Sequence, residues 1–189
     1  MMKLNNRYFI LRHGGSQCNR DGFVCSWPER RENPLTKEGR EQIKNIIPKA
    51  KKSKIDSIFS SDLLRARQTA QIVAETLGLK VKFDKRLREY NFGIYNGRPA
   101  EEWVRFLNGQ KDMFKKRPPK GETRREIRKR MLDFIKDIDK KYKDKRILIV
   151  SHREPLLELQ AGLMGLSDEE IYNNSVKLRL DTGEFRKLC

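Results

Sequence analysis

A short apolar run that ends in a charged pair and two glycines constrains this chain more than any other feature. Tyr8 to Leu11 form the run, and Arg12, His13, Gly14 and Gly15 follow directly. A short run that is apolar on both faces and ends at glycine predicts a buried strand entering a tight loop. Ligands of open α/β sheets bind at the carboxyl ends of strands, so Arg12 and His13 are predicted to face a substrate. The two glycines are expected to let backbone N–H groups approach an anion closely.

The second of the chain's two histidines stands in a matching context. Residues 146–151 are another apolar β-run, and His152 follows at once. One histidine after a strand is more often a structural imidazole with satisfied hydrogen bonds. Two histidines in the same setting, one of them beside Arg12, favour a shared site.

Length and composition predict one highly charged domain over residues 1–189, with 37% hydrophobic and 37% charged side chains. No apolar run is long enough to span a membrane, and no signal peptide is recognisable. The net charge of +17 permits non-specific attraction to polyanions. The lysines, however, alternate with apolar or acidic residues, as on solvated helix faces, and no nucleic-acid-reading motif is present. We therefore expect neither a membrane nor a dedicated nucleic-acid partner.

The three cysteines, Cys18, Cys25 and Cys189, form no paired framework and do not have zinc-site spacing. An odd count without an export signal favours a reducing, cytoplasmic location. Cys18 and Cys25 fall in the loop after the first histidine. We interpret them as small loop residues without chemistry of their own.

Further along the chain, strands alternate with helices, which predicts the α/β class. Helical spacing of apolar residues predicts helices from Thr36 to Pro48, from Ser61 or Asp62 to Leu77, and over 100–107, 123–142 and 155–164. Strands are predicted over 55–60, 79–83 and 146–150, with a C-terminal hairpin of 176–180 and 184–188. The polar segment 109–120 is predicted to be a mobile flap.

An ordered set of motifs resembles the histidine phosphatase superfamily, also called phosphoglycerate mutase-like. In chain order the motifs are Arg12-His13-Gly14, Asn19, Pro34 to Thr36 with Gly39, 60–70 around Arg65, Leu87 to Glu89, Phe92-Gly93 with Gly97, 119–123, and Val150 to His152. The first motif alone is a weak signal, whereas the ordered set covers nearly the whole chain. The resemblance implies a three-layer α/β/α sandwich with a mostly parallel central sheet.

The resemblance also implies roles for single residues in a metal-independent phosphomonoester hydrolase. His13 would attack phosphorus and carry the phosphoryl group, and Glu89 would protonate the leaving oxygen. Arg12, Arg65 and His152 would bind the phosphoryl oxygens and stabilise the transition state. The complete phosphate-binding set is expected to be Arg12, Gly14, Ser16, Asn19, Arg65, His152 and Arg153. No cofactor or metal is expected, and the partner would be a small phosphorylated substrate.

The chain departs from the family pattern at two points and from the pattern of true mutases at two more. Gly15 stands where the family usually has Glu or Gln, and Arg153-Glu154 replaces the usual pair of glycines. Arg153 either binds a second anionic group of the substrate or crowds the pocket, and Glu154 is a fallback acid. Ser26 replaces a glycine of true mutases, and the segment 109–120 is shorter than their substrate-covering insertion. Ser26 and the short 109–120 segment favour a phosphatase over a mutase.

Two other functions remain as alternatives. A phosphoglycerate mutase-type transferase would shield its phosphohistidine from water and return the phosphoryl group to the substrate. A degenerate relative would only bind phosphorylated partners or polyanions. The retained His13, Glu89 and His152 argue against the second alternative, because a binding protein has little use for a nucleophile together with an acid.

Overall fold

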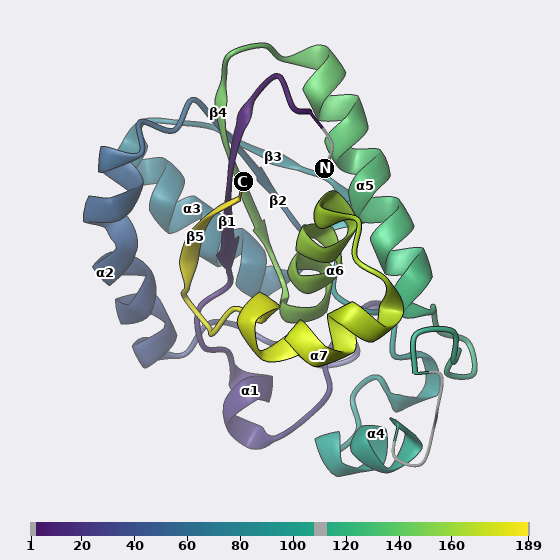
Figure 1. Cartoon of the computed structure of the whole chain (residues 1–189). Helices are drawn as coiled ribbons and strands as arrows, with labels where there is room; N and C mark the ends of the chain where they lie inside the picture. Colours follow the sequence, from purple (N-terminus) through teal and green to yellow (C-terminus); the bar gives the residue numbers. More distant parts are fainter. Residues whose placement is uncertain (1–2, 108–112, 189) are drawn as a thin grey trace.

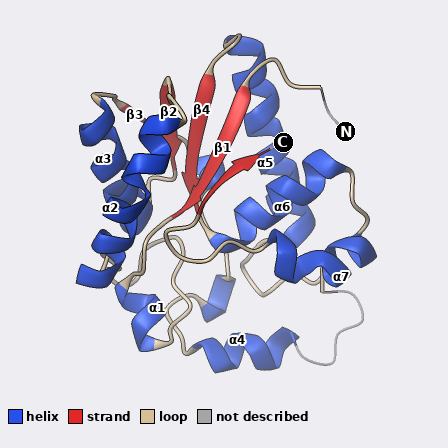
Figure 2. Ribbon diagram, turned by 60° about the vertical axis from the view of Figure 1, so that its left-hand side comes forward, coloured by secondary structure: helices blue, strands red, loops and turns tan. Residues whose placement is uncertain are grey.

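The two strands that carry the histidines lie side by side in a five-stranded sheet (Figures 1 and 2). The computed structural model describes residues 3–107 and 113–188. The strands follow the order β3 (Val81–Phe83), β2 (Ser57–Ser60), β4 (Arg146–Ser151), β1 (Arg7–Arg12) and β5 (Phe185–Leu188). All neighbours pair in parallel except β5, which is antiparallel to β1. The predicted α/β class with a mostly parallel sheet is therefore confirmed.

Both central strands are apolar on two faces because each face of the sheet has its own core. Tyr8 and Ile10 belong to one buried cluster, whereas Phe9 and Leu11 belong to the other. The residues of β4 alternate in the same way. This period of two follows from strand geometry, and a strand covered on both sides needs apolar residues at every position.

Helices cover both faces of the sheet and give three layers (Figure 2). Helices α2 (Lys37–Lys52) and α3 (Leu64–Leu77) pack on one face, and α5 (Arg124–Lys141) and α6 (Arg153–Met164) on the other. Helix α7 (Asp168–Leu178) packs against α6, while α1 (Gln17–Asp21) and α4 (Ala100–Leu107) lie beyond the carboxyl ends of β1 and β4 (Figure 1). No described helix is long and apolar enough to cross a membrane.

Side-chain caps begin and glycines end several of the predicted helices. The Thr36 hydroxyl accepts from the Gly39 N–H at the start of α2. Thr123 and Glu126 form a reciprocal capping box at α5. Helix α2 does not end at Pro48 but continues to Lys52. Proline there removes one hydrogen bond near the end of the helix, and the flanking turns continue past it.

The predicted C-terminal hairpin is wrong in its first half. Residues 168–178 form α7, and only Phe185–Leu188 is a strand. Ser167 and Glu170 form a capping box, and Ile171 and Leu178 lie seven residues apart on the buried side of the helix. Those signals outweigh the β-propensity of Val176, which is 82% exposed. Strand β5 instead pairs with the distant β1.

The predicted flap falls only partly within the described residues. Residues 109–112 lie outside them. From 113 onward the segment packs on the protein, because Phe114 is buried in a cluster with Leu157 and Ala161. The described part of the segment is therefore held against α6.

The loop after β1 passes very close to the start of α2. A Cβ atom on Gly14 would lie 2.3 Å from the Gly39 carbonyl oxygen, and one on Gly39 would lie 1.9 Å from that of Gly15. Backbone touches backbone here, so any side chain would push the loop and the helix apart.

Gly14→Ala is therefore expected to lower the free energy of unfolding by about 1–3 kcal/mol, the usual cost of overpacking. Gly15→Ala is the matched control. Its Cβ would meet nothing nearer than 3.5 Å, and its effect should stay within about 0.5 kcal/mol. Urea unfolding of both variants measures the difference, and equal stabilities would contradict the close approach.

Candidate active site

His13 follows β1, and the hydrogen bonds of its ring define a neutral imidazole with one unprotonated nitrogen. Its Nδ1 is 2.8 Å from the Gly14 carbonyl oxygen, which can only accept, so Nδ1 carries the proton. The Nε–H of Arg65 donates to His13 Nε2 at 3.1 Å, so Nε2 holds the lone pair. Burial first, and then the charges of Arg65 and Arg12, hold the pKa of His13 well below its ordinary 6.5. His13 is thus an uncharged imidazole at neutral pH, and its Nε2 lone pair is chemically able to act as a nucleophile.

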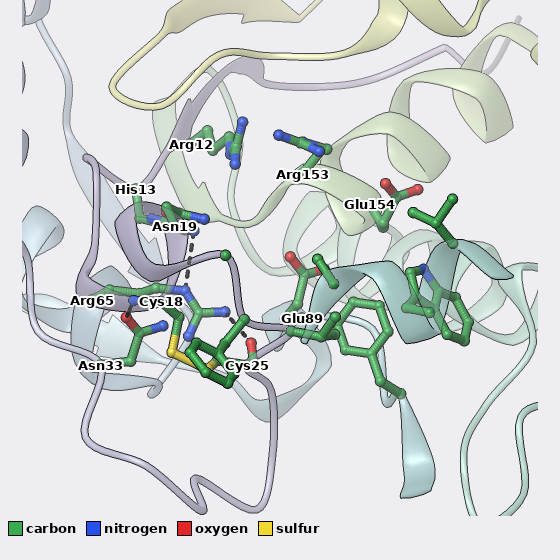
Figure 3. A pocket seen from close by; sticks show the side chains of 17 residues that line it. Arg12, His13, Cys18, Asn19, Cys25, Asn33, Arg65, Glu89, Arg153 and Glu154 are labelled. Carbon is green, nitrogen blue, oxygen red and sulfur yellow. Dashed lines mark hydrogen bonds between the residues drawn. A yellow bond between two sulfur atoms is a disulfide. The ribbon is translucent and has the colours of Figure 1, made fainter. Parts of the chain in front are cut away.

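Arg12 and Arg65 are buried guanidinium groups with donors to spare. Arg12 Nη1 donates to the Leu180 carbonyl at 2.9 Å, and Arg65 Nη2 to the Cys25 carbonyl at 3.0 Å (Figure 3). Arg12 Nε and Arg65 Nη1 are buried without a partner. Burial, and then the charge of Arg153, lower the pKa of Arg12 to about 10, so it stays charged at neutral pH. Buried donors that carry charge and lack partners indicate a site for an anion.

The parallel register brings His152 to His13. Arg12 pairs with Ser151, so each histidine follows the same level of the sheet, and their ring centroids are 5.1 Å apart. His152 Nε2 is 2.9 Å from the Ser61 hydroxyl, whereas its buried Nδ1 has no partner. Burial, and then the charge of Arg65, lower the pKa of His152 well below 6.5. The two histidines therefore lie side by side in the fold, as the sequence predicted.

Glu89 reaches the same cavity from the loop after β3 and η1 (Lys85–Leu87). Its Oε1 accepts from the Tyr90 N–H at 2.8 Å, and the residue is only 8% exposed. Burial raises the pKa of Glu89, the charge of Arg65 opposes that shift, and the carboxylate of Glu154 adds to it. A carboxyl with a raised pKa beside an imidazole is a candidate for a general acid, because its protonated form persists to higher pH than that of an ordinary glutamate.

The residues after His152 separate into two environments. Arg153 is exposed and lines the cavity next to Arg12 (Figure 3). Glu154 lies 2.9 Å from Arg124, whose Nε donates to the buried Glu158 at 2.7 Å. Sequence reasoning missed Arg124, because its contact with Glu154 joins two helices that are distant along the chain.

Three of the predicted phosphate-binding residues, Gly14, Ser16 and His152, are hydrogen-bonded to other protein groups in the structure. The N–H groups of Gly14 and Gly15 donate to Thr69 and to Gln42, so the expectation that they approach an anion is not met. Gly14, Ser16 and His152 do not line the cavity. The Ser16 hydroxyl instead donates to Oδ1 of Asn19 at 2.9 Å. Asn19 does line the cavity, and its amide nitrogen is the end that this bond leaves available.

Cys18 and Cys25 form a disulfide on the cavity wall, so the interpretation of unpaired loop thiols is wrong. Helix α1 ends at Gly22 with φ +72°, and the Phe23 N–H returns to the Cys18 carbonyl at 3.0 Å. That turn brings the two Cα atoms to 6.2 Å. The inference of a reducing compartment rested on unpaired thiols and loses that support.

The cavity that these residues share has a volume of about 280 Å³. Arg12, His13 and Arg65 line its charged end. Aromatic side chains of Phe23, Phe92 and Trp103 line another part, and sequence reasoning assigned them no role. Among the described residues, no three of the types His, Cys, Asp and Glu gather as metal ligands would.

The sequence and the structure of this chain are both similar to those of phosphatases and phosphoglycerate mutase-like proteins. A family model described as histidine phosphatase superfamily (branch 1) matches residues 8–183. A probable phosphoglycerate mutase GpmB from Escherichia fergusonii is 34% identical over 166 residues, covering 84% of this chain and 74% of the relative. A structure of alpha-ribazole phosphatase from Shigella flexneri has a TM-score of 0.79 at 28% identity, covering 95% of this chain and 88% of that one. A mycobacterial glucosyl-3-phosphoglycerate phosphatase, 22% identical, shares the fold with a TM-score of 0.81 over 95% of this chain and 88% of that one.

The disulfide predicts a specific peptide map. Trypsin cleaves after Arg12, Arg20 and Arg30, so an unreduced digest should contain peptides 13–20 and 21–30 joined together, and a reduced digest should separate them. Replacing both cysteines by serine should lower the free energy of unfolding by about 2 kcal/mol, because the unfolded chain regains freedom. Separate peptides in the unreduced, alkylated sample would show that the thiols are not paired.

Proposed function

Because the chain belongs to the histidine phosphatase superfamily, we propose that it is a metal-independent phosphomonoester hydrolase acting through a phosphohistidine on His13. The observation that carries the proposal is an uncharged imidazole beside unused guanidinium donors in one cavity. Attack on a phosphate ester needs a lone pair, correct positioning and fixed positive charge. His13 offers the lone pair, and Arg12 and Arg65 offer the charge and the donors that would position the phosphoryl group.

In the first step, Nε2 of His13 attacks phosphorus, and the bond from phosphorus to the ester oxygen breaks. The Arg65 Nε–H that bonds to Nε2 in the free protein turns to a phosphoryl oxygen as the substrate enters. The leaving oxygen takes the carboxyl proton of Glu89, so a neutral alcohol departs. Burial raises the pKa of Glu89, which favours the protonated form that this step needs.

In the second step, water attacks the phosphoryl group on His13. The Glu89 carboxylate takes a proton from the water, the bond from phosphorus to nitrogen breaks, and inorganic phosphate leaves. Nε2 regains its lone pair and Glu89 its proton, so the site returns to its starting state. One carboxyl thus serves as acid and then as base.

Three buried donors would stabilise the charge of the transition state. They are Arg12 Nε, Arg65 Nη1 and His152 Nδ1, each without a partner in the free protein. The Leu63 N–H donates to the Ser61 hydroxyl, whose own proton can then go to His152 Nε2, leaving a proton on Nδ1. The buried guanidinium charges of Arg12 and Arg65 would do here what a metal ion does in other phosphatases.

A phosphoglycerate mutase is the second candidate, favoured by the similarity to proteins described as probable phosphoglycerate mutases. Ser26 argues against it. This residue stands where true mutases have glycine, and it is buried with its hydroxyl donating to the Tyr90 carbonyl. A coupled assay separates the two functions. Conversion between 3- and 2-phosphoglycerate with little release of phosphate would identify a mutase.

The first test compares hydrolysis of p-nitrophenyl phosphate by the parent and by His13→Ala, both with EDTA present. Activity should survive the chelator and disappear in the variant, because no other described side chain of the cavity offers a neutral imidazole. Arg65→Ala should lose about 10²–10³ in rate. Arg67→Ala, an exposed residue of the same helix, is its control and should behave like the parent. Substantial turnover by His13→Ala would exclude the phosphohistidine.

The second test concerns Glu89 and pH. Because its acid form acts and its pKa is raised above 4.5, activity on alkyl phosphates should fall as pH rises through that pKa. The lowered pKa of His13 keeps the nucleophile neutral until pH is well below 6.5, so the acidic limb should lie there. Glu89→Gln should remove the basic limb and slow alkyl phosphates by about 10²–10⁴, but p-nitrophenyl phosphate much less. Equal losses on both would indicate another acid, with Glu154 the next to test.

A further inference from the structure

Given the proposed function, on which this inference rests, we propose that the substrate is a phosphomonoester of an apolar alcohol that carries an aromatic ring. The charged end of the cavity would take the phosphoryl group, and a preformed apolar wall would take the ring. The wall comprises Phe23, Val24, Phe92, Ala100, Trp103 and Val104, all of which line the cavity.

The apolar wall is continuous with the catalytic end of the cavity. Glu89 lines the same cavity as the wall, and its carboxyl is the group that would protonate the ester oxygen. The alcohol part of a bound ester begins at that oxygen, so it must extend into the part of the cavity that the charged residues leave open. Arg153 lies with Arg12 (Figure 3). Arg12 and Arg153 thus place positive charge at the phosphate end, while the guanidinium of Arg31 lies 4.0 Å from the ring centroid of Phe23, a wall residue.

Backbone hydrogen bonds hold the two halves of the wall together before any substrate binds. Phe23 and Pro99 form an isolated antiparallel bridge. On either side of it, the Val24 N–H donates to the Arg98 carbonyl at 2.9 Å and the Ala100 N–H to the Gly22 carbonyl at 2.8 Å. These bonds join the segment after α1 to the start of α4. A pocket that needs no rearrangement binds without an ordering cost.

Trp103 is fixed within a cluster of aromatic rings. Its ring centroid lies 5.2 Å from that of Tyr90, 5.0 Å from Phe92, 5.7 Å from Tyr95 and 5.3 Å from Phe106. Despite this packing, α4 has no buried residue, and Val104 is 50% exposed at the cavity. Aromatic and aliphatic surface is therefore held rigid and open beside a catalytic centre, where a bound ring would cover it.

The chemistry of the wall discriminates between kinds of alcohol. Five of its six side chains have no hydrogen-bonding group, and the sixth offers only an indole N–H. A sugar or glycerol moiety would lose water from its hydroxyls here without gaining partners, which is unfavourable. An aromatic ring loses nothing comparable and gains apolar burial and ring contacts.

The test uses three esters of primary alcohols, so that the leaving oxygens are chemically alike. They are 3-phenylpropyl phosphate, propyl phosphate and glycerol 1-phosphate. The parent should give a kcat/KM at least about tenfold higher for the phenylpropyl ester than for the other two, mainly through KM. Similar values for all three, or a preference for glycerol 1-phosphate, would overturn the inference.

Two variants locate the preference on the wall. Val104→Asn should reduce the tenfold ratio severalfold, because it adds a polar group to the exposed apolar surface without disturbing the core. Val176→Asn is the matched control, since Val176 is an exposed helical valine on α7 that does not line the cavity, and it should keep the parent ratio. An unchanged ratio in Val104→Asn would place the preference elsewhere and overturn the assignment to this wall.

A binding measurement separates this inference from the proposed function. The affinities of 3-phenylpropylphosphonate and propylphosphonate for the parent can be measured by calorimetry whether or not the chain hydrolyses anything. Tighter binding of the phenylpropyl compound without turnover of p-nitrophenyl phosphate would support the wall and refute the hydrolase. Turnover of p-nitrophenyl phosphate with equal phosphonate affinities would support the hydrolase and refute the wall.

Discussion

The parallel pairing of β1 with β4 is the constraint on which the candidate site depends. With Arg12 opposite Ser151, the two histidines leave the sheet at one level, and the His13 N–H donates to the Ser151 carbonyl at 3.1 Å. A slip of one residue would exchange the faces of every side chain on one strand and move one histidine about 3.3 Å along the sheet. The apolar residues that alternate between the two cores hold this register, so the hydrophobic packing of the sheet also positions the catalytic pair.

The same register gathers charge where the protein has little water. Two guanidinium groups lie beside two imidazoles whose pKa values are lowered and a carboxyl whose pKa is raised. Several of the donors have no hydrogen-bond partner within residues 3–107 and 113–188. Unpaired buried donors are unfavourable for folding, and groups with shifted pKa values gather at functional sites. An anion in the cavity would satisfy these donors, which is why the site is best understood as incomplete without its ligand.

Catalysis and substrate choice are assigned to different parts of the fold. His13 follows β1 and His152 follows β4, and the apolar residues of both strands are buried in the two cores. The residues of the apolar wall come from the loop after α1, the loop before α4, and α4 itself. None of these segments belongs to the sheet (Figure 1). Loops on a rigid scaffold can change with little effect on the core.

Local sequence patterns predicted the strands that carry the histidines, most of the helices and the residues at the charged end of the cavity. Those features depend on local patterns, such as the apolar run before His13 and the cap at Thr36, and on an ordered set of motifs. Only the tertiary structure decided the rest. It joined Cys18 to Cys25, placed Arg124 on Glu154, turned the Gly14 N–H away from the cavity and built the wall around Trp103. Each of these depends on where a turn ends or on contacts between segments far apart in the chain, which local periodicity does not record.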